Sequence, residues 1–136
     1  MSQHTPPPRH PKQQRQSSSR RELPRGRAKL AAYRVARVVA QQVSEIRFPR
    51  GEGHLRYHVV RAANNTTLRI SEACGHAGGL RRIHLEAAYA ECQEVQADLE
   101  MACDRGITVP QSLIRQADRL GGLIFGLLRS MLGSND

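Results

Sequence analysis

The sequence predicts an all-α protein, an antiparallel up-down-up-down four-helix bundle that follows a disordered basic N-terminal arm. Three observations indicate this. Apolar residues recur every three or four positions from about residue 30 to residue 132, Gly and Pro separate four such segments, and residues 1–29 contain almost no large aliphatic side chains. A chain of 136 residues allows one domain with a single core. We therefore expect an arm at 1–29, a bundle at 30–132 and a disordered tail at 133–136.

The arm is distinguished by composition and charge. Its Pro, Gln, Ser and Arg residues offer too little apolar surface to offset the entropy of ordering. It carries eight Lys and Arg against one Glu, a net charge of +7, whereas the other 107 residues carry thirteen against eleven, a net charge of +2. A flexible, strongly basic segment is typical of non-specific contacts with phosphate groups.

The first two helices follow from the spacing of their apolar residues. The first is expected from residue 30 to near Phe48, where Pro49 disfavours helical geometry in the residue before it. Its apolar face is formed by Leu30, Tyr33, Ala36, Val39, Val43 and Ile46. The second should run from about His54 to Cys74, and glycines after it break the helix. Its inward residues are expected to be Leu55, Val59, Ala62, Ala63, Thr66, Ile70 and Ala73.

The third and fourth helices show similar periodicity. For the third helix, at about 80–105, we expect an inward stripe of Ile83, Ala87, Ala90, Glu94, Ala97 and Met101. A second apolar series lies close to that stripe and comprises Leu85, Ala88, Cys92, Val95, Leu99 and Ala102. Gly106 stands where a left-handed cap is expected. The last helix should open with Thr108 and Gln111 as a capping box around Pro110, and a broad apolar face continues to Met131.

Two short motifs support a family resemblance. Arg61-Ala62-Ala63 and Ile70-Ser71-Glu72 lie in the second helix, and a Gly106-Ile107 turn precedes a final helix of LGGLIFGLLRSML type. The chain resembles the four-helix bundle family of ribosomal-RNA intervening-sequence proteins and the related accessory variability proteins of diversity-generating retroelements. The resemblance implies a homo-oligomer, typically a pentamer, with a basic surface and a nucleic-acid-associated role, and a reverse transcriptase or another element-encoded enzyme as a possible partner.

Arginines supply the candidate nucleic-acid-binding residues. In the last helix, Arg115, Arg119 and Arg129 share one line with Gly122 and Gly126, at steps of four, three, four and three. We assign the two glycines to helix packing, within or between subunits, because each costs the helix roughly 1 kcal/mol relative to alanine. The other candidates are Arg20, Arg21, Arg25, Arg27, Arg34 and Arg37. No aromatic residues interleave with these clusters, so binding should depend on phosphate charge rather than on base stacking.

Charged residues near the apolar stripes predict structural ion pairs. A buried carboxylate needs a partner, so Glu72 and Glu94 are expected to pair with Arg61 or Arg69, and we prefer this interpretation to a ligand role. The strip of Glu91, Glu94 and Asp98 is expected to be solvated or paired with Arg61, Arg81 or Arg82. The consecutive Asn64, Asn65, Thr66 and Thr67 are unusual at a helix centre and are candidates for a subunit contact.

Catalytic and metal chemistry find little support in the sequence. His54 and His58 lie four apart without a further ligand at suitable spacing, and the three cysteines show no CxxC motif, so we expect no metal site, no cofactor and reduced thiols. No nucleophile, metal cluster or phosphate loop is visible, which ranks a hydrolase or nuclease last. The chain also lacks a signal segment and a membrane span, which predicts a cytoplasmic location without membrane contact.

These observations leave two main hypotheses for the function. The first is a non-enzymatic, homo-oligomeric nucleic-acid-binding accessory protein. The alternative is a protein–protein interaction scaffold whose basic arm contacts acidic surfaces and which has no nucleic-acid role. The sequence does not distinguish DNA from RNA.

Overall fold

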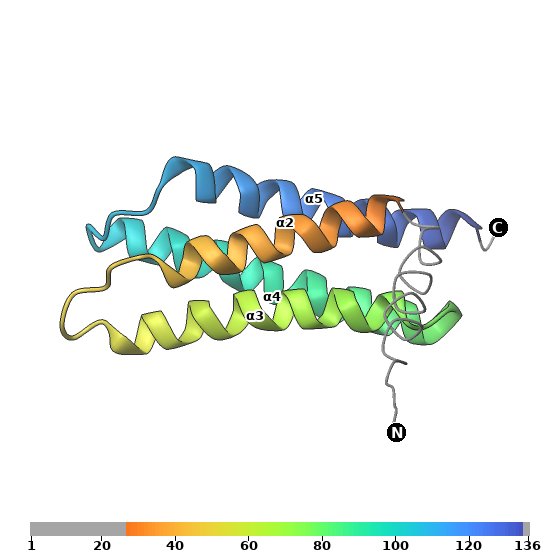
Figure 1. Cartoon of the computed structure of the whole chain (residues 1–136), viewed down its shortest axis with the longest axis horizontal. Helices are drawn as coiled ribbons and strands as arrows, with labels where there is room; N and C mark the ends of the chain where they lie inside the picture. Colours follow the sequence, from red (N-terminus) through yellow and green to blue (C-terminus); the bar gives the residue numbers. More distant parts are fainter. Residues whose placement is uncertain (1–26, 135–136) are drawn as a thin grey trace, which may run out of the picture.

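Four antiparallel helices form the computed structural model, which describes residues 27–134 (Figure 1). They are α2 Arg27–Ser44, α3 Gly53–Cys74, α4 Gly78–Asp104 and α5 Gln111–Ser134. The predicted all-α four-helix bundle is thereby confirmed. Most of the expected arm, residues 1–26, and the last two residues lie outside the described part of the chain. None of the four described helices has the length and apolar composition that a membrane span requires.

The helix ends differ from the sequence-based expectation by a few residues. α2 begins at Arg27, inside the segment expected to be the arm, and α5 continues to Ser134, beyond the expected end at residue 132. α2 also ends at Ser44, four residues before Phe48. Its end is closed by short-range bonds, because the amides of Glu45 and Ile46 donate to carbonyl oxygens three residues back, at 3.1 and 3.2 Å.

The connection between α4 and α5 shows one confirmed and one incorrect expectation. Gly106 adopts φ +78°, the left-handed conformation predicted for the end of α4. The capping box of Thr108 and Gln111 is not formed. Instead α5 begins after Pro110, whose carbonyl oxygen accepts the amides of Leu113 and Ile114 at 3.0 and 3.3 Å. Pro110 suits this position because it has no amide hydrogen of its own to satisfy.

The helices pack as a square in which neighbours along the chain are neighbours in space. α2 contacts α3 and α5, and α4 also contacts α3 and α5. Within residues 27–134 the diagonal pairs α2–α4 and α3–α5 do not pack on one another. The largest fully buried aliphatic side chains come from three helices: Ile70, Leu85, Leu113, Leu120 and Ile124. Small residues between them, such as Ala62 and Ala88, let the helices approach closely.

α4 buries a different face from the one predicted. Its core residues are Leu85, Ala88, Cys92, Val95, Leu99 and Ala102, together with Asp98. The stripe that we expected to face inward is instead on the outside: Ile83 is 58% exposed and Met101 40% exposed, and Ala90 and Ala97 are also exposed. That expectation was wrong because both series share the same three- and four-residue spacing and contain many alanines, so periodicity did not separate them.

Candidate nucleic-acid interface

The line of arginines and glycines on α5 is an exposed surface. Arg115, Arg119 and Arg129 are all exposed, and Gly122 and Gly126 lie between them on the same side. The core face of α5 is opposite and contains Leu113, Leu120 and Ile124. Because the five residues step by four and three, they form one continuous strip along the helix, which we call the α5 arginine strip.

The two glycines of this strip do not pack against another helix of the same chain. A Cβ atom added at Gly122 or Gly126 would meet no neighbouring atom within 4 Å. The packing role predicted for them is therefore absent within residues 27–134, and a contact between subunits stays a prediction. The packed glycine of α5 is Gly121, where a Cβ would lie 3.4 Å from Nε2 of Gln96 and 3.8 Å from Sγ of Cys92.

Aromatic rings do accompany the arginines, contrary to our expectation. The Arg129 guanidinium lies 6.0 Å from the centre of the Phe125 ring, which is 48% exposed. On α2, the Arg37 guanidinium lies 5.9 Å from the ring of Tyr33. Both pairs are four residues apart on one helix, so the spacing in the sequence was the signal that we missed. A guanidinium held over a ring keeps its charge while its orientation is restricted.

No carboxylate pairs with the arginines of the α5 arginine strip among the described residues. The nearest acidic residue in the sequence, Asp118, accepts a hydrogen bond of 3.0 Å from Nε2 of Gln96 on α4. Asp118 is itself exposed and lines the same open pocket as Gly122 and Phe125, so one carboxylate borders the three arginines and the strip keeps an excess of positive charge. Such a surface attracts anions at low ionic strength.

The remaining predicted arginines are distributed over other places. Arg34 and Arg37 are exposed on α2, but Arg37 lines an open groove against α3 rather than the α5 arginine strip. That groove also contains Asn64 and Thr67. Arg20, Arg21 and Arg25 lie outside the described residues, and only the backbone of Arg27 is described. α2 and α5 are antiparallel neighbours, so α2 begins at the end of the bundle where Arg129 lies (Figure 1).

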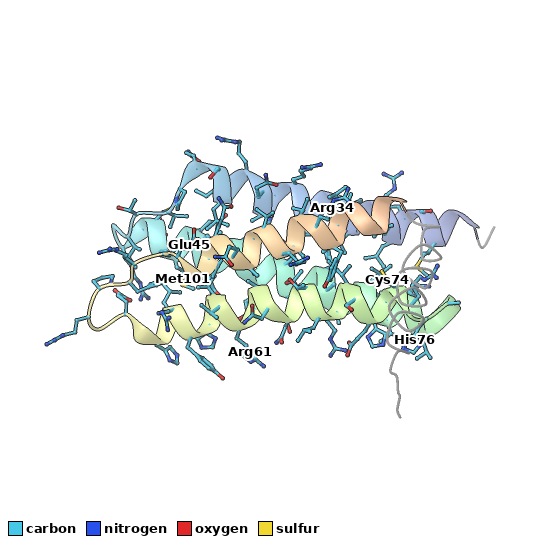
Figure 2. The ribbon with its side chains drawn as sticks, viewed as in Figure 1. Arg34, Glu45, Arg61, Cys74, His76 and Met101 are labelled. Atoms are coloured by element: carbon cyan, nitrogen blue, oxygen red, sulfur yellow. The ribbon has the colours of Figure 1, made fainter. Side chains whose placement is uncertain are left out.

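Only part of the predicted ion-pair set is formed. Arg69 and Glu72 pair within α3 at 3.4 Å, and both also approach Nδ1 of His84 on α4, at 3.4 and 3.3 Å. Glu72 is exposed rather than buried. Glu94 contacts His58 at 3.7 Å and not an arginine. Arg61 forms no ion pair within the described chain, so the predicted bridge between Arg61 and these carboxylates is wrong. The reason is that Arg61 is exposed on the outer side of α3 and points away from the bundle (Figure 2).

The buried carboxylate of the bundle is Asp98, which the sequence had placed on a solvated strip. Its side chain is 6% exposed and its Oδ2 has no hydrogen-bond partner. Burial raises the pKa of Asp98, the neighbouring Glu94 carboxylate raises it further, and His58 partly lowers it. On the same side of α4, Glu91 accepts a bond of 3.5 Å from Asn65, and its Oε1 is buried without a partner. Negative charge is therefore in local excess between α3 and α4.

Replacing Asp98 with Asn should stabilise the protein at neutral pH. Because the folded-state pKa of Asp98 is raised, the folded state binds the proton more tightly, and its stability falls as the pH rises through that pKa. We expect Asp98→Asn to increase the free energy of unfolding by about 1 kcal/mol at pH 7, with no difference below about pH 4. Urea titrations of both proteins at the two pH values measure this, and a stability loss at pH 7 would contradict it.

The polar run at the centre of α3 is partly accounted for by bonds within the helix. The Thr66 hydroxyl is buried and donates to the carbonyl oxygen of Ala62 at 2.8 Å, and Thr67 donates to Ala63 at 3.2 Å. Thr66 thus faces inward, as its helical position predicted. Asn64 is the exposed member of the run. A subunit contact formed by all four residues is therefore wrong, because Thr66 lies in the core.

Histidines and cysteines do not assemble into a reactive centre in the described part of the chain. Residues 27–134 contain no group of three His, Cys, Asp or Glu side chains that could hold a metal ion. The rings of His54 and His58 meet edge to face, 4.6 Å apart. Burial, with a smaller contribution from Asp118, raises the pKa of Cys92 to about 12, so this thiol stays protonated at neutral pH.

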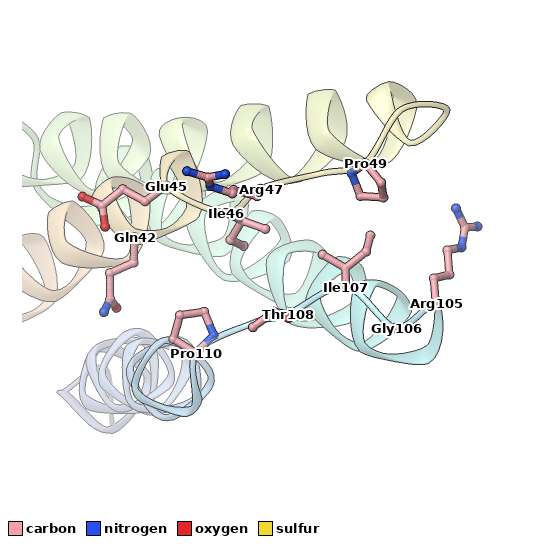
Figure 3. A pocket seen from close by; sticks show the side chains of 10 residues that line it. All are labelled: Gln42, Glu45, Ile46, Arg47, Pro49, Arg105, Gly106, Ile107, Thr108 and Pro110. Atoms are coloured by element: carbon pink, nitrogen blue, oxygen red, sulfur yellow. The ribbon is translucent and has the colours of Figure 1, made fainter.

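An open cleft of about 510 Å³ lies between the two loops at one end of the bundle (Figure 3). Its lining combines Glu45, Arg47 and Arg105 with the apolar side chains of Ile46 and Ile107. Arg105 is already engaged, because its Nη1 lies 2.7 Å from Oε1 of Glu52. The lining contains neither histidine nor cysteine, and its charges are mixed, so the cleft lacks the one-sided cationic character of the α5 arginine strip.

Comparison with known proteins found no match: no family model, no curated protein and no solved structure resembles the chain significantly.

Proposed function

We propose that this chain acts, as a homo-oligomer, as a non-enzymatic nucleic-acid-binding accessory protein. The observation that carries the proposal is the α5 arginine strip, in which three exposed guanidinium groups without a carboxylate partner border two glycines with open space above them. Guanidinium groups form forked hydrogen bonds with phosphate oxygens, and glycines allow a backbone to come close. The basic segment that precedes α2 supports the proposal, since it joins the bundle at the end where Arg129 lies.

The chemistry of this surface favours phosphate contacts over base recognition. Among the described residues near the α5 arginine strip, Phe125 is the aromatic side chain that is substantially exposed. The Arg129 guanidinium lies over its ring. A stacking platform for several bases needs more exposed rings than this. Binding should therefore be weakly sequence-specific and governed by charge. Assistance to a reverse transcriptase or another element-encoded enzyme is the role that the family resemblance suggests for such a protein.

Substituting Arg115, Arg119 and Arg129 together by Ala tests the proposal. We expect binding of a DNA or RNA duplex to weaken and the slope of log affinity against log salt to decrease by about 3, since each phosphate contact contributes about one unit. A matched control replaces three exposed arginines at the loop end of the bundle, Arg47, Arg50 and Arg56, and removes the same charge. Equal effects of the two triple variants, measured by fluorescence anisotropy, would show that only net charge matters and not the α5 arginine strip.

The glycines provide a second test in which stability and binding should change in opposite directions. Gly122→Ala with Gly126→Ala should stabilise α5 by up to about 2 kcal/mol, because alanine is the better helix former and each added Cβ meets open space. If a phosphate backbone approaches these glycines, the same variant should bind nucleic acid more weakly. Thermal unfolding and titration of one preparation measure both effects. A variant that is more stable and binds as tightly as the wild type would remove the glycines from the interface.

Absence of binding at low salt would reject the nucleic-acid role. The interaction scaffold would then be the better interpretation, with acidic protein surfaces as the targets of the α5 arginine strip.

A further inference from the structure

The groove between α4 and α5 combines an apolar floor with acidic walls. Near the turn that joins the two helices it forms a hollow of about 230 Å³. Leu99 and Ala117 are buried at its floor, and three exposed carboxylates line its sides, those of Glu100, Asp104 and Asp118. The lining contains no Lys, Arg or His. This hollow, which we call the acidic hollow, is therefore suited to a positively charged ligand.

The carboxylates of the acidic hollow have no cationic partner within residues 27–134. Glu100 and Asp104 form no ion pair there, and Asp118 accepts its hydrogen bond of 3.0 Å from the neutral amide of Gln96. The arginine that follows Asp104 in the sequence, Arg105, is engaged with Glu52 instead. Like charges around one groove repel one another, and a cation placed among them would relieve this repulsion.

The same groove continues along α4 and α5 as an aromatic hollow. This second hollow, of about 330 Å³, shares Gln96 and Asp118 with the acidic hollow. It extends to Gly122 and to the rings of Tyr89 and Phe125, whose centres are 6.0 Å apart. A Cβ atom at Gly122 would meet open space, so this part of the groove is not filled by the bundle. Aromatic-lined grooves are a recurring binding mode for proline-rich segments.

The chain contains a segment whose composition matches both parts of the groove. Residues 1–26 carry six Lys and Arg against one Glu, which complements the three carboxylates of the acidic hollow. They also contain five of the seven prolines of the chain, which suit the rings of the aromatic hollow. Charge complementarity and composition thus point to the same occupant.

This segment is long enough to reach the groove of its own chain. It joins α2 at Arg27, at the end of the bundle where Arg129 lies (Figure 1). From there the path passes around α5, a helix of about 10 Å diameter, and follows it for about 23 Å, from the level of Arg129 to that of Ile114. Twenty-six extended residues span up to about 86 Å. The length therefore permits docking without a second copy of the chain.

We infer that residues 1–26 dock in the α4–α5 groove of their own chain, with Lys and Arg among the three carboxylates and prolines against the aromatic rings. A docked segment is not free to contact phosphate groups, so docking competes with nucleic-acid binding and regulates it, a consequence that rests on the proposed function. Nucleic acid, with its higher charge density, would release the segment. Exposed ion pairs contribute little to the free energy of unfolding, so docking is best detected by proximity.

Cross-linking to the native thiol of the acidic hollow tests where the segment docks. Cys103 lines this hollow and is exposed, whereas Cys92 is buried. In a Cys74→Ser background, the full chain with Gln14→Cys should be cross-linked to Cys103 within one chain by a short bis-maleimide, as read by peptide mass spectrometry. The matched control carries Cys103→Ser and Ser44→Cys, which moves the acceptor thiol to the exposed groove between α2 and α3. We expect about fivefold more cross-link at Cys103, because docking raises the effective concentration there.

Removing the charge of the acidic hollow should abolish this preference. Glu100→Gln with Asp104→Asn should lower the yield at Cys103 to that of the Ser44→Cys control, and about 0.5 M salt should act in the same way by screening the charges. Equal yields at the two acceptor thiols, a yield that the double variant leaves unchanged, or a cross-link between two chains would each overturn the inference. These measurements need no nucleic acid and are independent of the proposed function.

Nucleic-acid affinity tests the competition. The variant with Glu100→Gln and Asp104→Asn is compared with Glu45→Gln combined with Glu86→Gln, which removes two exposed carboxylates outside the groove. The groove variant should bind about tenfold more tightly than this control if the segment is docked in about nine of ten molecules. Equal affinities would overturn the competition. A wild-type protein that binds no nucleic acid would reject the proposed function and the competition with it, whereas docking itself is decided by the cross-link.

Discussion

Raising the salt concentration from about 50 to about 200 mM should weaken nucleic-acid binding on the order of 1,000-fold if six or more phosphates are neutralised. The cations available for this are the α5 arginine strip and the six Lys and Arg of residues 1–26, a segment that carries one Glu. The proposed homo-oligomer would multiply both and add avidity. Anisotropy titrations at the two salt concentrations measure the change, and binding that is insensitive to salt would contradict a phosphate-based mode.

Removing residues 1–26 separates the contribution of this segment from that of the folded bundle. We expect weaker binding and a smaller salt slope, because the segment supplies a net charge of +5. Thermal unfolding should stay nearly unchanged, since the core of α2 to α5 is formed by residues of the bundle itself. A large loss of thermal stability would show that the segment contributes to the fold.

The second large effect concerns the face that α4 buries. Leu85→Ala should lower the free energy of unfolding by about 3 kcal/mol, because Leu85 is 1% exposed and its removal leaves a cavity. Leu80→Ala is the matched control on the same helix: Leu80 is 55% exposed, and the loss should stay within about 0.5 kcal/mol. Chemical denaturation of the two variants and the wild type measures these losses.

Equal losses in the two variants would contradict this assignment of the core. A larger loss for Leu80→Ala would mean that this residue, and not Leu85, packs in the core.

The sequence predicted the number, order and approximate limits of the helices because each signal was local. Glycine at 106 and proline at 49 mark the ends of helical segments, and the apolar face of α5 is broad and continuous. The inward face of α4 was not predictable in the same way. Two series of residues with identical spacing alternate along α4, and alanine occurs in both. Which series is buried therefore depends on how α3 and α5 pack against α4.

The candidate site shows the same division between local and tertiary information. The α5 arginine strip was visible from spacing, and the pairs of Arg129 with Phe125 and of Arg37 with Tyr33 could have been found from theirs. The buried Asp98 could not, because its exposure depends on α3 covering one side of α4. The partner of Glu94 likewise depends on the register between two helices, which placed His58 beside it rather than Arg61.

The square arrangement of the helices also bears on the order of folding. Three of the four helix–helix contacts join helices that follow one another directly along the chain, and only α2 with α5 joins distant segments. Local contacts form with little loss of loop entropy, so we expect the hairpin of α3 and α4, with its short turn at Gly75, to form before α2 packs against α5. Closure of α2 onto α5 then completes the core, and it carries the largest entropic cost because it brings the two ends of the bundle sequence together.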